Sequence, residues 1–75
     1  MKDHEAITEI INEYGRATDK FKTFNTPHEG YAVILEEMDE LWKSIKENQA
    51  PEAMAREAIQ VGAMAMRFLI DCTPD

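Results

Sequence analysis

Thirteen consecutive residues, AIQVGAMAMRFLI at positions 58–70, constrain the fold most, because only Gln60 and Arg67 among them are polar. We expect this run to belong to one helix from Pro51 to Asp71, since proline is favoured at the first position of a helix. A helix that is apolar on nearly every side must be covered on nearly every side. We do not expect two amphipathic helices of the same chain to supply all of that cover. The run therefore predicts that a second copy of the chain supplies the rest.

The N-terminal part of the chain has the spacing of an amphipathic helix. Its apolar residues recur at steps of three and four, namely Ala6, Ile7, Ile10, Ile11, Tyr14, Ala17 and Phe21. This spacing repeats along one side of an α-helix. Asp3 is the predicted N-cap, and we expect the helix to end near the segment KFKTFN at residues 20–25.

A second helix has a sharper start signal. Thr26 is the predicted N-cap, Pro27 takes the first helical position, and Glu29 reaches back to complete a capping box. The apolar stripe that follows consists of Tyr31, Ile34, Leu35, Met38, Leu41, Trp42 and Ile45. The helix is predicted to end near Lys46, and ENQAP at residues 47–51 is predicted to form the turn into the third helix.

Length and charge limit the class of protein. Seventy-five residues fit a single domain covering residues 1–75, and the net charge of −7 disfavours duplex nucleic acid and anionic membranes, since both attract Lys and Arg. The longest apolar run, VGAMAM, is too short to span a bilayer, and we expect no signal peptide. A single cysteine, Cys72, fits a reducing compartment. We therefore predict a cytoplasmic all-α protein: a three-helix chain that forms a helical bundle completed by homo-oligomerisation.

The second helix carries two carboxylates that could act together, Glu37 and Glu40. On a helical wheel they share the flank of the apolar stripe, whereas Glu36, Lys43 and Glu47 lie on the solvated side. Residues three apart on a helix are neighbours, so the two carboxylates could converge on one point. Such pairs also occur on ordinary solvated faces, and the spacing alone leaves both interpretations open.

A narrow polar stripe runs along the third helix, because Glu57, Gln60, Arg67 and Asp71 fall within about 80° of one another on the wheel. In one interpretation Glu57 stabilises the first turns of the helix and Arg67 extends to the surface. In the other, the stripe packs against the acidic edge of the second helix, so that three carboxylates and an amide oxygen surround a small space. Oxygen ligands of this kind suit Mg²⁺, or Mn²⁺, rather than zinc.

The segment EEMDEL at residues 36–41, followed by Glu57-x-x-Gln60, resembles the MazG-like all-α nucleoside triphosphate pyrophosphohydrolase superfamily. The pattern of that superfamily is ExxE, a spacer and ExxD on two neighbouring helices of an oligomeric bundle, and the resemblance covers about residues 21–72. It implies that Glu37, Glu40 and Glu57 are catalytic residues and Mg²⁺ ligands. It also implies that Gln60 is a fourth ligand, at the position where the family has aspartate.

The resemblance further implies a reaction, the Mg²⁺-dependent cleavage of a nucleoside triphosphate to a monophosphate and pyrophosphate. Asn25 and His28 would then bind the nucleotide, and Phe24 or Tyr31 could stack on its base; the alternative is that these residues only cap or staple the helix start. Gln60 brings no charge and cannot act as a base. The alternative function is therefore a non-catalytic helical module that binds nucleotide or a protein partner, and a third possibility is a purely structural helical dimer.

Overall fold

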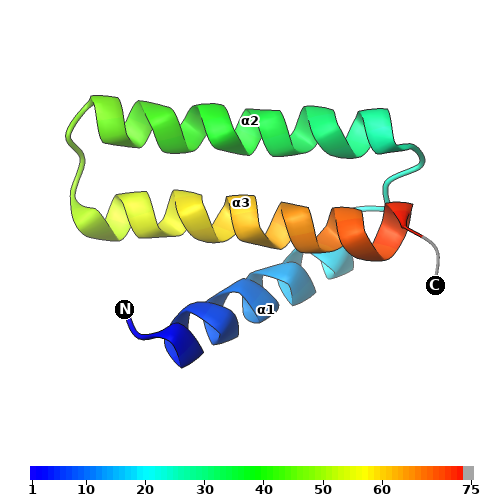
Figure 1. Ribbon diagram of the computed structural model, residues 1–75, viewed down its shortest axis with the longest axis horizontal. Coiled ribbons are helices and arrows are strands. Elements are labelled where there is room, and N and C mark those ends of the chain that lie inside the picture. Colours follow the sequence, from blue (N-terminus) through cyan, green and yellow to red (C-terminus); the bar gives the residue numbers. More distant parts are fainter. Residues whose placement is uncertain (74–75) are drawn as a thin grey trace.

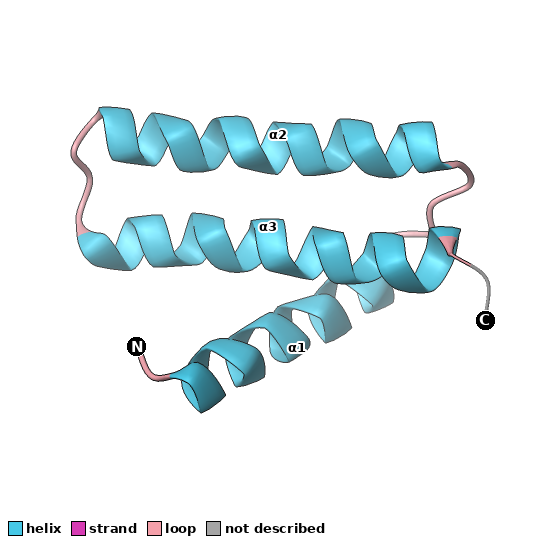
Figure 2. Ribbon diagram, viewed as in Figure 1, coloured by secondary structure: helices cyan, strands magenta, loops and turns pink. Residues whose placement is uncertain are grey.

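The computed structural model describes residues 1–73, and within them the chain is all-helical, as predicted. The helices are α1 (Asp3–Lys20), α2 (Pro27–Lys46) and α3 (Pro51–Cys72), and Figure 2 shows that loops make up the remainder. Helices α2 and α3 lie side by side and antiparallel, while α1 crosses α3 at an angle (Figure 1). In the part of the chain that the structure describes, α1 and α2 each pack on α3 and not on each other. Completion of the bundle by a second copy stays a prediction.

The start of α2 forms as predicted, with one difference. The Thr26 hydroxyl accepts a hydrogen bond from the Glu29 backbone N–H at 3.1 Å, and Pro27 occupies the first position of the helix. The Glu29 carboxylate, however, accepts from the backbone N–H of Asn25 at 3.3 Å rather than from that of Thr26. This bond ties the preceding loop to the helix. Local polar contacts therefore set both the start of α2 and the path of the chain that enters it.

The other helix ends also lie close to their predicted positions. Helix α2 ends at Lys46, and the turn into α3 contains Asn48 with φ 53°, a left-handed conformation that asparagine tolerates well. Asp3 was predicted to be the N-cap of α1, which is wrong: Lys2 is the N-cap, and Asp3 is the first helical residue. The Glu5 carboxylate accepts a hydrogen bond from the Lys2 backbone N–H at 3.4 Å. This bond explains why the helix begins one residue earlier than predicted.

The core lies where α1, α2 and the loop between them meet on α3. Ala63 and Met64 of α3 are buried there, together with Ala17 of α1 and Phe24 of the loop. Ala63, Met64 and Arg67 are the residues of α3 that the chain buries, and Ala65 between them is exposed, so one chain covers only one side of the middle of this helix. Residues 69 and 70 in its C-terminal part are also exposed.

Two glycines allow the helices to approach α3 closely. A Cβ atom on Gly30 of α2 would lie 2.7 Å from Phe68 Cδ2, and one on Gly62 of α3 would lie 2.9 Å from Ile10 Cδ1 of α1. Real Cβ contacts are essentially never that short. The absence of a side chain at these two positions therefore sets the distance of α2 and of α1 from α3.

Helix α2 packs on α3 through a different face from the one that its apolar residues suggested. Gly30 and Ser44 are buried, and Glu37, seven residues from each, lies half-buried between them on the same side of the helix. The Ser44 hydroxyl donates to Gln49 Oε1 at 3.0 Å, which satisfies it. Five of the seven predicted apolar residues are 43–63% exposed, and we call them the α2 stripe: Tyr31, Leu35, Met38, Trp42 and Ile45. None of the described helices is long and apolar enough to cross a bilayer.

Candidate functional site

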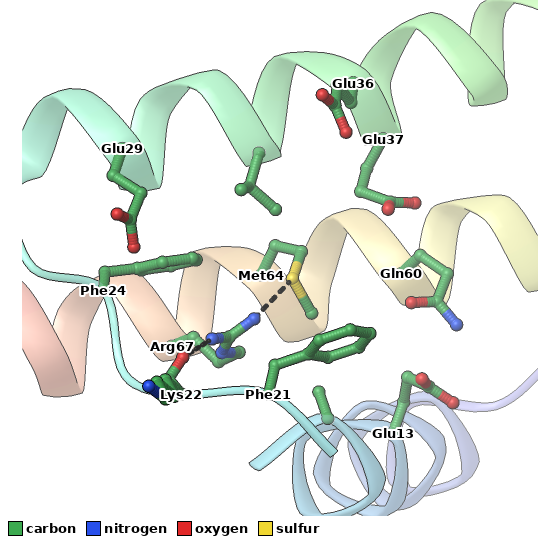
Figure 3. A pocket seen from close by; sticks show the side chains of 12 residues that line it. Glu13, Phe21, Lys22, Phe24, Glu29, Glu36, Glu37, Gln60, Met64 and Arg67 are labelled. Atoms are coloured by element: carbon green, nitrogen blue, oxygen red, sulfur yellow. Dashed lines mark hydrogen bonds between the residues drawn. The ribbon is translucent and has the colours of Figure 1, made fainter.

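A groove lies between α1 and α2, with α3 as its floor, and has a volume of about 440 Å³ (Figure 3). It exists because α1 and α2 pack on α3 without contacting each other. The α1–α2 loop closes one end of the groove. Its lining residues come from all three helices and the loop: Glu13 and Ala17; Phe21, Lys22 and Phe24; Glu29, Val33, Glu36 and Glu37; Gln60, Met64 and Arg67.

One end of the groove, which we call the acidic end, is lined by Glu13, Glu36, Glu37 and Gln60. Figure 3 shows that these residues come from three helices: Glu13 from α1, Glu36 and Glu37 from α2, and Gln60 from α3. The structure thus brings Glu37 and Gln60 to one groove, as the second interpretation of the polar stripe expected.

The pKa of Glu37 is raised above its ordinary value of 4.5, first by burial and then by the negative charges of Glu57, Glu40, Glu36 and Glu13. Burial disfavours the charged form of a carboxyl group, and neighbouring carboxylates disfavour it further. Glu37 therefore stands at the centre of a cluster of like charges. Glu57 itself lines a neighbouring hollow, together with Glu13 and Gln60, and not the groove.

Glu13 belongs to this cluster although the sequence analysis did not select it. Burial raises the pKa of Glu13, but the Gln60 amide and the Arg16 guanidinium outweigh burial and lower it. Arg16 Nε donates to Glu13 Oε1 at 2.9 Å. The signal that could have identified Glu13 is its position three residues after Ile10 and four before Ala17, on the packed side of α1.

The other end of the groove, which we call the arginine end, is lined by Phe21, Lys22, Phe24, Glu29 and Arg67. Arg67 is 4% exposed, so the interpretation in which it extends to the surface is wrong. Its Nη2 donates to the Lys22 carbonyl oxygen at 2.7 Å, and its guanidinium carbon lies 4.2 Å from the centroid of the Phe24 ring. The aromatic face and the carbonyl hold the cation inside the fold.

Arg67 is nevertheless incompletely satisfied. Its Nη1 contacts Met64 Sδ at 3.4 Å, and sulfur is a weak acceptor. Its Nε is buried and has no hydrogen-bond partner within residues 1–73. In the same residues, no carboxylate lies within 4.0 Å of the guanidinium nitrogens. The arginine end therefore holds a buried cation without an ionic partner.

The remaining predicted residues lie outside the groove. Glu40 is exposed on α2, and Asn25 is exposed in the loop, where its backbone N–H is held by Glu29. His28 lines a separate apolar hollow with Tyr31 and Phe68. A single chain therefore does not place Asn25 or His28 next to Glu37.

The donors at the acidic end fit a hard cation in chemistry. Carboxylates and an amide carbonyl are the ligands that Mg²⁺ prefers, and mutual repulsion around Glu37 is the electrostatic condition that a cation relieves. Among the described residues, however, no three His, Cys, Asp or Glu side chains are already grouped to hold a metal ion. Binding of a cation by these side chains would therefore require them to rearrange.

Comparison with known proteins adds no relative to this description, because no family model, curated protein or solved structure matches the chain.

Proposed function

We propose that the protein is a Mg²⁺-dependent nucleotide pyrophosphohydrolase that cleaves a nucleoside triphosphate to a monophosphate and pyrophosphate in the groove. The observation that carries this proposal is the position of Glu37. It lies on the face of α2 that packs against α3, it lines the groove, and its pKa is raised by burial and then by four neighbouring carboxylates. A purely structural helix pair gains nothing from this arrangement, since like charges at an interface are destabilising.

The proposed roles follow from the chemistry of the side chains. Glu37, Glu40 and Glu57, together with the Gln60 carbonyl oxygen, would hold the cation. Bound Mg²⁺ supplies charge neutralisation of the phosphates and lowers the pKa of water. The raised pKa of Glu37 reflects burial and the neighbouring carboxylates, and a cation bound there would relieve that repulsion.

The proposal is tested by measuring pyrophosphate release from a panel of ribo- and deoxynucleoside triphosphates, with Mg²⁺ and with EDTA. We expect release that needs Mg²⁺ and is lost in Glu37→Gln. The matched control is Asp39→Asn, which removes a carboxylate from an exposed position two residues along α2 and outside the groove. Absence of release from every nucleotide by the folded protein would overturn the proposed activity.

A second candidate function, binding of nucleotide or a protein partner without hydrolysis, is favoured by Gln60. This residue is a neutral amide next to Glu13 at the acidic end, and no ligand set is already grouped among the described residues. The variant Gln60→Asp separates the two functions. If the native protein is inactive and Gln60→Asp releases pyrophosphate, the binding function is favoured. If the native protein already releases pyrophosphate and the variant is no faster, the enzyme is favoured.

We also propose that the α2 stripe packs against a second copy of the chain. Its members, Tyr31, Leu35, Met38, Trp42 and Ile45, alternate at steps of four and three residues, which is the spacing of a helix–helix seam. They form an exposed apolar surface on one helix. Contiguous apolar surface of this kind marks interaction sites.

Trp42 offers a direct test, because it is the single tryptophan of the chain and is 57% exposed in one copy. If two copies pair through the α2 stripe, dilution will shift its fluorescence emission to longer wavelength as the mass measured by sedimentation falls. Leu35→Glu should give a monomer at all concentrations. A native protein that is monomeric at high concentration would contradict the pairing.

A further inference from the structure

The buried Arg67 is the part of the groove that the proposed chemistry leaves unexplained. Metal binding and water activation belong to the acidic end, where Glu37 and Gln60 lie. Arg67 is seven residues beyond Gln60 on α3, which corresponds to about 10 Å along the helix. Figure 3 shows Met64 between these two residues. A group bound at Arg67 is therefore a different part of the ligand from the part that reacts.

The lining of the groove favours an uncharged ring at the arginine end over a phosphate group. Four glutamates line the groove against two cations, Lys22 and Arg67, so an additional anion would be repelled unless a metal accompanied it. The apolar side chains of Val33 and Met64 and the ring of Phe21 also line the groove, and Met64 contacts Arg67 directly. Phe21 is 58% exposed, so its ring is available for stacking. These features suit a nucleobase.

The direction in which the base would lie follows from the two ends. If the triphosphate reacts at the acidic end, the sugar lies between the ends and the base points its far edge at the arginine end. That edge carries the C6 substituent of a purine or the C4 substituent of a pyrimidine. Arg67 would therefore face this substituent.

Arginine can only donate hydrogen bonds. Of its five N–H groups, one is bound to the Lys22 carbonyl and one to the weakly accepting Met64 sulfur. Phe24 covers one face of the guanidinium, so the ligand must accept at the edge of the plane, where the N–H groups point. A carbonyl oxygen at C6 or C4 can accept there, whereas the amino group at the same position cannot, so adenine or cytosine could pair these donors only by shifting a ring nitrogen toward them.

We propose, on the basis of the proposed function, that Arg67 makes the site selective for keto bases (guanine, hypoxanthine, uracil or thymine) over the amino bases adenine and cytosine. The base stacks on Phe21, and its C6 or C4 carbonyl accepts from Arg67. Arg67 thus determines specificity, and it takes no part in the bond cleavage at the acidic end.

The first experiment compares kcat/KM for triphosphates of the four bases. We expect guanine and uracil or thymine nucleotides to exceed adenine and cytosine nucleotides by about 10-fold or more, the discrimination typical of one well-placed arginine contact to a base. Arg67→Gln, which can both donate and accept, should reduce this ratio to near one. Arg67→Lys is the matched control, because it only donates and should keep the direction of the preference. Circular dichroism and thermal unfolding establish that each variant is folded.

A second measurement separates the two proposals. Nucleoside 5′-monophosphates, which have no pyrophosphate to release, are titrated into the native protein with Mg²⁺ to offset the charge of the phosphate, and binding is followed by calorimetry. Tighter binding of GMP and UMP than of AMP and CMP, without hydrolysis of any triphosphate, would support the role of Arg67 and overturn the proposed activity. Hydrolysis at equal rates for all four bases, or faster for adenine or cytosine, would overturn the role of Arg67 and leave the activity standing. If no nucleotide is bound or hydrolysed, both proposals are wrong.

Discussion

The acidic end and the arginine end of the groove carry opposite charges that do not neutralise each other. At the acidic end, burial and the negative charges of glutamates from α1, α2 and α3 raise the pKa of Glu37. At the arginine end, Arg67 is buried with an unpartnered Nε and no carboxylate within 4.0 Å among the described residues. Pairing a glutamate with Arg67 would remove much of the electrostatic cost at both ends.

The difference between the ends shows where a ligand would contribute. Within residues 1–73, packing buries both groups without giving either an ionic partner: Glu37 lies half-buried on the face of α2 that packs on α3, and Arg67 is buried beneath Phe24 with its Nε unpartnered. A molecule with a metal-bound polyphosphate at one end and a hydrogen-bond acceptor at the other would relieve both. Unsatisfied groups of this kind cluster at functional sites, where the rest of the fold stabilises them.

The largest expected effect comes from removing the charge of Glu37 alone. Glu37→Gln keeps the shape of the side chain but deletes a proposed ligand, so we expect kcat/KM for pyrophosphate release to fall by about 100-fold or more. The melting temperature without Mg²⁺ should not fall, because the substitution also removes repulsion from the acidic end. Steady-state kinetics and thermal unfolding of the same sample check both expectations. An unchanged kcat/KM would mean that the repulsion around Glu37 has no catalytic purpose.

The arginine end can be disturbed through its packing. In Gly30→Ala, the new methyl group would lie 2.7 Å from Phe68 and 3.1 Å from Phe24, the ring that covers Arg67. We expect the free energy of unfolding to fall by about 1–3 kcal/mol, as for other overpacked sites. The measurement is urea unfolding followed by circular dichroism.

Gly15→Ala is the matched control for this change, because nothing lies within 4 Å of a Cβ atom at Gly15 in α1. It should stabilise the protein by about 0.5–1 kcal/mol, the ordinary gain from replacing glycine by alanine inside a helix. Equal effects of the two substitutions would show that the contact of α2 with Phe68 and Phe24 is looser than described.

Much of the fold could be predicted from the sequence because its signals are local. Thr26, Pro27 and Pro51 define helix starts through contacts within one turn, and α2 and α3 begin where these residues predict. The meeting of Glu37 with Gln60 could also be predicted, since a polar stripe on an otherwise apolar helix needs a polar neighbour. These inferences depend on spacing along one helix at a time.

The rotation of α2 could not be predicted in the same way. Its apolar stripe suggested one buried face, but the structure buries Gly30 and Ser44, which are too small to give a hydrophobic signal, and leaves Trp42 exposed. An apolar stripe does not tell which surface will cover it. The burial of Arg67 depends likewise on Phe24 and Lys22, residues distant in sequence. Tertiary contacts of this kind are absent from helical periodicity.

The contrast between the ends can be reduced by placing a cation at the acidic end. In Gln60→Lys, the ammonium group would stand near Glu13 and Glu37, and we expect a gain in stability of less than about 1 kcal/mol, as for other partly exposed ion pairs. The gain should vanish at high salt. Addition of Mg²⁺ should not raise the melting temperature of this variant, because the lysine occupies the proposed cation site. A variant that still responds to Mg²⁺ like the native protein would place metal binding elsewhere.

The smallest expected effect is the dependence of stability on pH, measured in EDTA. Because the folded state raises the pKa of Glu37, it binds this proton more tightly than the unfolded chain does. The resulting stabilisation is complete below the ordinary pKa of 4.5 and is lost as the pH rises through the raised value. Glu13 acts in the opposite direction, but its lowered pKa confines that effect to pH values below 4.5. Above pH 4.5, the melting temperature should therefore fall with rising pH more steeply in the native protein than in Glu37→Gln. Parallel curves for the two proteins would mean that solvent screens the charges around Glu37, and only the arginine end, where Arg67 is buried, would then carry an electrostatic cost.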